Sequence, residues 1–187
     1  MIVAGVDLAL NATGLVIAHA ALVGEEQIFD VRLAELVRPG ERRGMERIAW
    51  VMSRVRGLVL EHGVQDLAIE GYAFSKLTTH AHEQGELGGV VRLSLWQRGI
   101  SWWEVTPATL KKIVTGKGNA PKGAMLVEVL DRWKWKTSDD NLADAYALAR
   151  CVASHHLGFS RRVDAQAWEK AERVEGRKIA TTEGAAA

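Results

Sequence analysis

The chain has 187 residues, a length that suits one globular domain with a short tail. Nearly half of the residues are hydrophobic and the formal net charge is +1, so any binding of nucleic acid must come from local basic patches. The sequence has no membrane-spanning apolar run, no basic start of a signal peptide and only one cysteine, Cys151, so we expect a soluble, cytoplasmic protein with no membrane partner.

The first part of the chain predicts three strands in succession, over residues 2–9, 15–21 and 27–37. Apolar residues at helical spacing then predict a helix over residues 42–62, followed by a short strand over residues 66–72. The remaining pattern predicts a helix over 81–97, a strand over 100–105 and helices over 107–114, 121–133 and 138–157. Thr106 and Pro107 form a strong helix start, and Thr137 or Ser138 is the expected cap of the last helix.

Three strands followed by strand–helix alternation indicate an α/β fold with a mixed five-stranded sheet flanked by helices. After residue 158 the composition becomes charged and ends in small residues. We therefore assign residues 1–158 to one domain and residues 159–187 to a charged, partly flexible C-terminal tail, in which Trp168 could hold a helix.

Several acids occupy places that a surface position explains poorly. Asp7 lies inside an apolar strand, and Glu70 ends the strand that begins near residue 66. Asp144 lies among alanines and shares a helix face with Asp140, four residues earlier. A charge in a protein core costs several kcal/mol unless it is paired or binds a metal. We expect these four carboxylates to converge and to bind divalent cations, as two-metal phosphoryl-transfer sites do.

Each acid also has a simpler explanation. Asp7 could be a structural acid beside the turn that follows it, and Asp144 could be an exposed acid on a helix. Asp139 and Asp140 fall in the first turn of a predicted helix, where the helix dipole favours any acid. The combination of acids from separate elements is more specific than any one of them.

Two parts of the sequence resemble known families. The segment Gly5-Val6-Asp7-Leu8-Ala9, followed by Thr13-Gly14-Leu15, resembles the first hairpin of the RNase-H-like superfamily. The strand end at Glu70, the loop over 115–122 and the segment over 140–149 are similar, in this order, to the RuvC-type Holliday junction resolvases. The similarity covers roughly residues 2–155 and implies an RNase-H-like fold. It further implies a homodimer that nicks opposed strands of a four-way DNA junction with two Mg²⁺ ions per site, or Mn²⁺.

By this resemblance the first three metal ligands are Asp7, Glu70 and Asp144. The bacterial pattern places its other helical ligand three residues before the last aspartate, where this chain has Asn141. Asp140 can reach the same face and is the expected fourth ligand, with Asp139 as the alternative. An acid at this position resembles variants among phage and mitochondrial members of the family. The expected location is the cytoplasm of a bacterial or phage-infected cell.

A basic segment with no acid lies between residues 105 and 127, and its lysines are Lys111, Lys112, Lys117 and Lys122. These lysines could bind DNA phosphates, or the loop could simply be solvated. The resemblance implies that Lys117 or Lys122 lies near the scissile phosphate, where a cation stabilises developing charge.

Two further features have a functional and a structural interpretation. Tyr72 and Phe74 follow Glu70, where the family has an aromatic residue that wedges into the junction centre, and Phe74 is the better positional match. The alternative for both is simple packing. The helix over 81–97 resembles the family's dimer helix, with Gly85 and Gly88 one turn apart, or it packs against its own sheet.

The function expected from these features is a structure-selective, metal-dependent endonuclease that resolves four-way DNA junctions. A broader branched-DNA nuclease and a non-catalytic junction-binding module are the alternatives that also bind DNA. An actin-like or sugar-kinase-like ATPase is the alternative from another enzyme class. The chain is too short for the two domains of such an ATPase and has no second glycine-rich phosphate hairpin.

Overall fold

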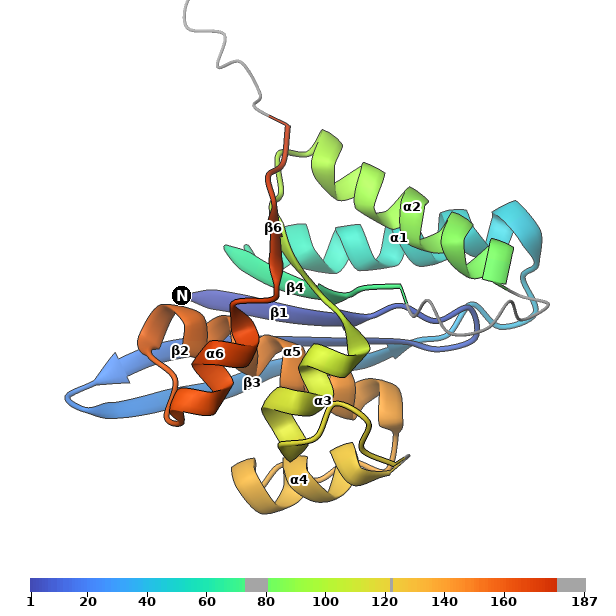
Figure 1. The fold of residues 1–187 in the computed structure, drawn as a ribbon. Coiled ribbons are helices and arrows are strands. Elements are labelled where there is room, and N and C mark those ends of the chain that lie inside the picture. Colours follow the sequence, from blue (N-terminus) through green and yellow to red (C-terminus); the bar gives the residue numbers. More distant parts are fainter. Residues whose placement is uncertain (73–80, 122, 178–187) are drawn as a thin grey trace, which may run out of the picture.

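The computed structural model describes residues 1–72, 81–121 and 123–177, and shows one mixed sheet with helices on both faces (Figure 1). The strands are β1 (Ile2–Asp7), β2 (Thr13–Val23), β3 (Glu26–Val37), β4 (Asp66–Glu70), β5 (Trp102–Val105) and β6 (Glu172–Val174). Across the sheet their order is β3-β2-β1-β4-β5-β6. β1 pairs antiparallel with β2 and parallel with β4, and β4 pairs parallel with β5.

The sheet has six strands, whereas the sequence predicts five. The additional strand, β6, pairs antiparallel with β5. The sequence does not predict this strand because it is short and mostly charged. The preceding helix α6 (Arg162–Trp168) buries Ala167 and Trp168 in the core. The fold therefore continues beyond residue 158, at least to the end of β6.

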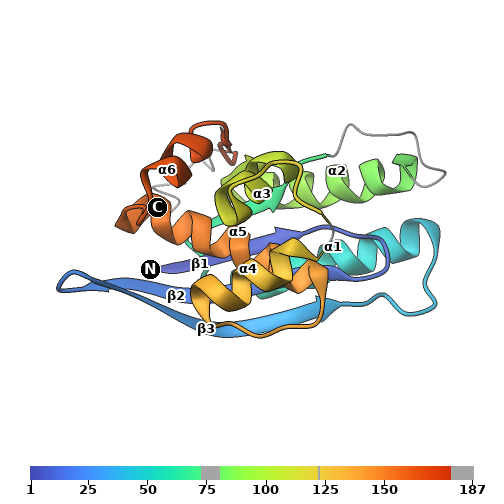
Figure 2. The same cartoon turned by 60° about the horizontal axis from the view of Figure 1, so that its bottom comes forward.

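The helices form two layers, one on each face of the sheet (Figures 1 and 2). α1 (Gly44–Glu61) and α2 (Ala81–Gln97) cover one face, where they pack on a core cluster that includes Val6 and Ile69. α3 (Pro107–Thr115), α4 (Ala124–Trp133), α5 (Asp140–Leu157) and α6 cover the other face. β1 is buried on both faces, which explains its uninterrupted apolar sequence up to Asp7. Among the described helices none is long and apolar enough to cross a membrane.

Three helix starts test the capping predictions. The Thr106 hydroxyl accepts a hydrogen bond from the backbone N–H of Thr109 at 3.2 Å, which confirms the predicted start of α3. α4 begins at Ala124 and not at residue 121, because Gly123 adopts a left-handed φ of 84° that a helix cannot include. The cap of α5 is Asp139, and not Thr137 or Ser138. Its carboxylate accepts from the backbone N–H groups of residues 141 and 142 at 3.0 and 3.3 Å, because the helix begins at Asp140 and residue 139 therefore holds the cap position.

α5 lies directly on β1 and β2 because glycine is present at the two points of closest approach. A Cβ atom at Gly5 would overlap with the backbone carbonyl of Ala145, and a Cβ atom at Gly14 would overlap with the carbonyl of Asn141. The buried face of α5 is largely alanine, which keeps the distance between helix and sheet short. This contact fixes the position of Asp144, the residue before Ala145, relative to the end of β1.

Gly5→Ala is expected to lower the free energy of unfolding by at least about 3 kcal/mol, because the added methyl group meets backbone atoms that cannot rotate away. Chemical denaturation of the two proteins measures the difference. Gly57→Ala is the matched control, because Gly57 lies within α1 with open space around it. That change should stabilise the protein by about 0.5–1 kcal/mol through helix propensity. Equal effects of the two substitutions would contradict the close contact of α5 with β1.

Candidate active site

Two carboxylates meet at one edge of the sheet because the strands that carry them are parallel. Asp7 is the last residue of β1 and Glu70 is the last residue of β4, and the preceding residues, Val6 and Ile69, are register partners. The two carboxyl groups are hydrogen-bonded to each other. Asp144 reaches the same place from α5 and acts electrostatically on both. The structure therefore brings together the three acids that the sequence singled out.

Burial dominates the electrostatics of this cluster. Asp7 is only 7% exposed, and burial raises its pKa to about 6, against the opposing effect of the hydrogen bond with Glu70 and with a further rise from Asp139. Burial, together with the negative charges of Asp7 and Asp144, raises the pKa of Glu70 well above its usual range. Without a cation, burial and mutual repulsion therefore oppose full ionisation of the cluster.

Asp144 has no compensating partner on one of its oxygens. Burial raises the pKa of Asp144 to about 7, and the charges of Asp7 and Asp140 add to this rise, whereas Lys111 lowers it. Its Oδ1 atom is buried without a hydrogen-bond partner among the described residues. A buried carboxylate oxygen without a donor costs free energy, which a bound cation would recover.

These residues fit a hard divalent cation in their chemistry. The donors are all carboxylate oxygens, which Mg²⁺ and Mn²⁺ prefer, and their mutual repulsion is relieved by positive charge. Within the described residues, no three acidic, histidine or cysteine side chains are already grouped around one point as metal ligands. Carboxylates bind a cation in their deprotonated form, so the raised pKa values of Asp7 and Glu70 couple cation binding to the loss of protons from the cluster.

The first turn of α5 separates the three candidates for a fourth ligand. Asp139 is the helix cap, and its second oxygen lies 3.8 Å from the guanidinium of Arg38. Asn141 donates from its side-chain amide to the carbonyl of Ala12 at 2.6 Å, which fastens the β1–β2 loop to α5. Asp140 is the acid of this turn whose charge reaches Asp144. Position 141 is therefore structural in this chain, whereas the charges of both neighbouring acids reach the cluster, Asp139 at Asp7 and Asp140 at Asp144.

The predicted DNA-binding residues lie in different surroundings. Lys111 is close enough to the cluster to lower the pKa values of Glu70 and Asp144. Lys112, the next residue of α3, lines a hollow between α3 and α6, and Lys117 is exposed in the following loop. Lys122 and Phe74 lie outside the described residues. Among the described lysines, Lys111 is thus the one whose charge reaches the carboxylates. The resemblance had instead implied Lys117 or Lys122 of the following loop.

Tyr72 is 40% exposed and already has contacts within the chain. Its hydroxyl donates to the carbonyl of Gly85 at 3.3 Å, and the guanidinium of Arg92 lies 4.6 Å from its ring centroid. Arg92 also donates to the backbone carbonyl of Glu70 at 2.9 Å and pairs with Glu104 at 2.7 Å. The sequence analysis missed this arginine, which positions the end of β4. Its signal in the sequence is a single charged residue within the largely apolar stretch from Leu87 to Leu95.

Comparison with known proteins places these features in one family. The family model for crossover junction endodeoxyribonuclease RuvC matches residues 3–152. The chain belongs to the RuvC family. The RuvC of Brachyspira hyodysenteriae is 30% identical over 160 residues, which cover 86% of this chain and 98% of that protein. The RuvC of Moorella thermoacetica is 30% identical over 158 residues, which cover 82% and 92% of the two chains.

Solved RuvC structures share the fold. The Thermus thermophilus RuvC structure has a TM-score of 0.70 at 23% identity and covers 84% of this chain and 97% of its own. The structure of the same protein in complex with a Holliday junction substrate also has a TM-score of 0.70, at 21% identity, and covers 93% and 99% of the two chains. The RNase-H-like fold and the RuvC resemblance expected from the sequence are confirmed, with six strands in place of five.

The raised pKa values predict how the stability of this RuvC-family protein depends on pH. Carboxyl groups with raised pKa values bind protons more tightly in the folded chain, so in metal-free buffer the free energy of unfolding should fall as the pH rises from about 4 to about 7. Asp144→Asn should flatten this fall and raise Tm at pH 8 by on the order of 4 °C. Thermal unfolding in EDTA measures both effects.

The matched control is Asp30→Asn, because Asp30 is an exposed acid on β3 whose ion-pair partner, Arg32, is also exposed. Its Tm should follow that of the wild type across the pH range. A wild-type Tm that rises steadily from pH 4 to pH 8 in EDTA would contradict the raised pKa values.

Proposed function

We propose that this RuvC-family protein resolves four-way (Holliday) DNA junctions by paired, metal-dependent nicking. The observation that carries the proposal is the cluster of buried carboxylates from β1, β4 and α5, with one oxygen of Asp144 unsatisfied. The names of the bacterial relatives, crossover junction endodeoxyribonucleases, support the choice of substrate. The cytoplasm of a bacterial or phage-infected cell is the proposed setting.

The proposed cofactor is Mg²⁺, or Mn²⁺, with two ions per site held by Asp7, Glu70, Asp140 and Asp144. Bound ions of this kind polarise a phosphate oxygen and make the attacking water more acidic. The chain's own part is to hold these four carboxylates together in a cluster where cation binding is coupled to the loss of protons. Hydrolysis breaks one P–O bond, with 5′-phosphate and 3′-hydroxyl ends as the expected products.

The basic residues of α3 and of the loop after it are the proposed DNA contacts. Lys111 lies where it can offset negative charge at the cluster, and Lys117 and Lys122 follow in the loop. Lys112, Tyr72 and Phe74 are proposed to contact DNA further from the cut. Because each chain carries one cluster, two opposed nicks require two chains, and we propose a homodimer.

Asp7→Asn is expected to lower the rate of junction cleavage by at least about 100-fold, because it removes a donor from the cation site. Binding of the junction should change little. The assay uses a labelled four-way junction, a matched duplex and a flap with Mg²⁺, and compares their cleavage. Asp30→Asn is the control that removes an exposed acid and should cut at the wild-type rate.

The other outcomes of this assay distinguish the alternatives. Equal cutting of junction and flap would favour the broader branched-DNA nuclease. Tight junction binding without cutting in Mg²⁺ or Mn²⁺ would favour the non-catalytic module. Full activity of Asp7→Asn would show that the carboxylate cluster is not the active site.

The proposed dimer contact is the exposed stripe of α2. Gly88 already packs against side chains of its own chain, since a Cβ atom there would meet Tyr72 and Arg92, so it is not available for a contact with a second chain. The outer side of α2 instead exposes Leu93 at 52% and Trp96 at 39%. With Gly89 they recur at intervals of four and three residues, as in a helix–helix contact.

Leu93→Glu is expected to weaken self-association by at least about 30-fold, because a carboxylate would be buried in the helix contact. Sedimentation equilibrium of the two proteins measures the change. Leu22→Glu is the control, because Leu22 is also 52% exposed but lies at the far end of β2. A monomeric wild type, or equal association of both variants, would contradict the assignment of α2.

A further inference from the structure

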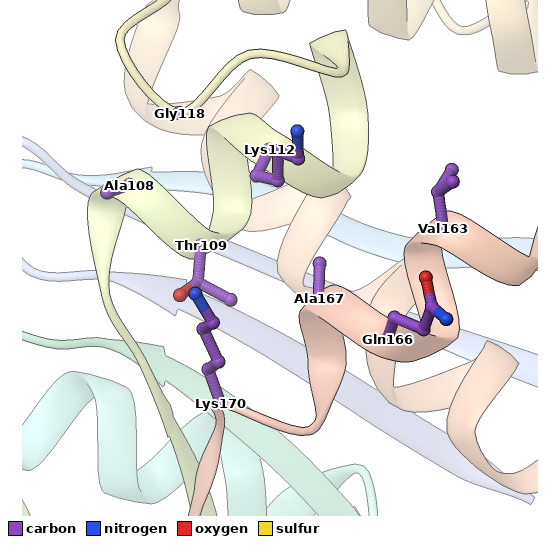
Figure 3. Close-up of a pocket in the computed structure, with 8 residues that line it drawn as sticks. All are labelled: Ala108, Thr109, Lys112, Gly118, Val163, Gln166, Ala167 and Lys170. Atoms are coloured by element: carbon purple, nitrogen blue, oxygen red, sulfur yellow. The ribbon is translucent and has the colours of Figure 1, made fainter.

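A hollow of about 440 Å³ lies between α3 and the C-terminal helix α6 (Figure 3). Ala108 from α3 and Val163 and Ala167 from α6 provide its apolar lining. The side chains of Thr109 and Gln166 add polar groups to the same space. The volume falls within the range of about 300–1,000 Å³ that is typical of sites for small molecules. The hollow is therefore larger than a single phosphate group requires.

The charge of this hollow is one-sided. Lys112 from α3 and Lys170, which follows α6, both line it, and none of its described lining residues is acidic. Both lysines are exposed, and neither ammonium group has a hydrogen bond or an ion pair with another described residue. Two unpaired cations beside an apolar surface match a ligand that has a phosphate and an apolar body.

A second hollow on the side of the candidate active site shares one lining residue with the first. Lys170 also lines this second hollow, of about 330 Å³, which begins at Gly71 and Tyr72. Those two residues directly follow Glu70 of the carboxylate cluster. The second hollow is lined by Glu104 and Glu172, whose negative charges would repel a phosphate. The described residues that line the first hollow include no acid, so a phosphate that binds Lys170 is expected in the first hollow.

We propose that the hollow between α3 and α6 binds one nucleotide unit of the DNA substrate. Its phosphate lies between Lys112 and Lys170, and its sugar and base contact the apolar surface around Val163 and Ala167. The proposal rests on the proposed nuclease function and extends it to a DNA contact away from the cut. α6 and Lys170 lie beyond residues 3–152, which the family model matches, so the C-terminal segment supplies half of this site.

The two rigid sides of the hollow have a structural cause. Asp164 of α6 is fully buried and accepts hydrogen bonds from the guanidinium of Arg161 at 2.9 Å and from Arg132 of α4. Both arginines also donate to the backbone carbonyl of Ile113 in α3, at 2.6 and 2.9 Å. This network ties α6 to α3 and holds the hollow open in the folded chain.

The test measures the affinity of the full chain for a labelled four-way junction in EDTA, over a range of salt concentrations. Lys112→Ala and Lys170→Ala should each weaken binding by about three- to tenfold, and the double variant should reduce the slope of log K against log salt by roughly 0.9, as expected for one lost phosphate contact. Arg162→Ala is the matched control, because Arg162 is an exposed cation of α6 that does not line the hollow. Its affinity should change by less than about twofold.

A second pair of variants tests the space itself. Val163 is 55% exposed at the hollow, so Val163→Trp should fill the space without disturbing the core. It should weaken junction binding by about fivefold or more, whereas Arg162→Trp should not. The cutting rate at saturating DNA should stay at the wild-type value in the two Arg162 variants. If Lys170→Ala weakens junction binding but Val163→Trp does not, the hollow does not hold a whole nucleotide, and the proposal is wrong.

The outcomes separate this proposal from the proposed function. If the wild type cuts the junction but the lysine variants behave like Arg162→Ala, the hollow is not a DNA contact and the nuclease function stands. If the wild type neither binds nor cuts the junction, the proposed function fails, and the nucleotide site fails with it.

Discussion

The close contact between α5 and β1 is the constraint on which the rest of the structure depends. At Gly5 the backbone of the strand meets the backbone of the helix, so no side chain can lie between them. The alanines on the buried face of α5 extend this short separation along the helix. A larger separation would move Asp144 away from the ends of β1 and β4, and the carboxylates would no longer share one buried place. The packing of small residues is thus the physical origin of the candidate active site.

That arrangement concentrates like charges where water is largely excluded. Asp7, Glu70 and Asp144 all have raised pKa values, with burial as the largest cause in each case. In the absence of a cation the cluster lowers the stability of the folded chain at neutral pH. Sites built for function often carry such a cost, because a cation that relieves the repulsion can then be bound strongly. Asn141 and Arg92 support the cluster from outside by fixing the β1–β2 loop and the end of β4.

The C-terminal segment extends the same domain through buried ion pairs. Asp66 at the start of β4 accepts from the indole N–H of Trp103 at 3.1 Å and contacts His156 at 2.8 Å. It also pairs with Arg173 of β6, which joins the last strand to the centre of the sheet. Asp164 pairs with Arg132 and Arg161 and in this way joins α6 to the same domain. Each acid is compensated by more than one donor, as a buried carboxylate requires. These contacts make α6 a fixed partner of α3.

The sequence by itself determined the order of the elements from β1 to α5, because the apolar periodicity and the cap at Thr106 are local signals. It also singled out Asp7, Glu70 and Asp144, because an acid next to an apolar strand or alanine-rich face is conspicuous without any coordinates. Only the tertiary structure decided that β6 joins the sheet, since its charged residues carry no strand pattern and its pairing with β5 spans about 70 residues of chain. The tertiary structure likewise decided between Lys111 and Lys112, which are adjacent in sequence but have different surroundings, the carboxylate cluster for Lys111 and the hollow beside α6 for Lys112. Adjacent helical residues point about 100° apart, so what each one meets depends on packing that no local pattern contains.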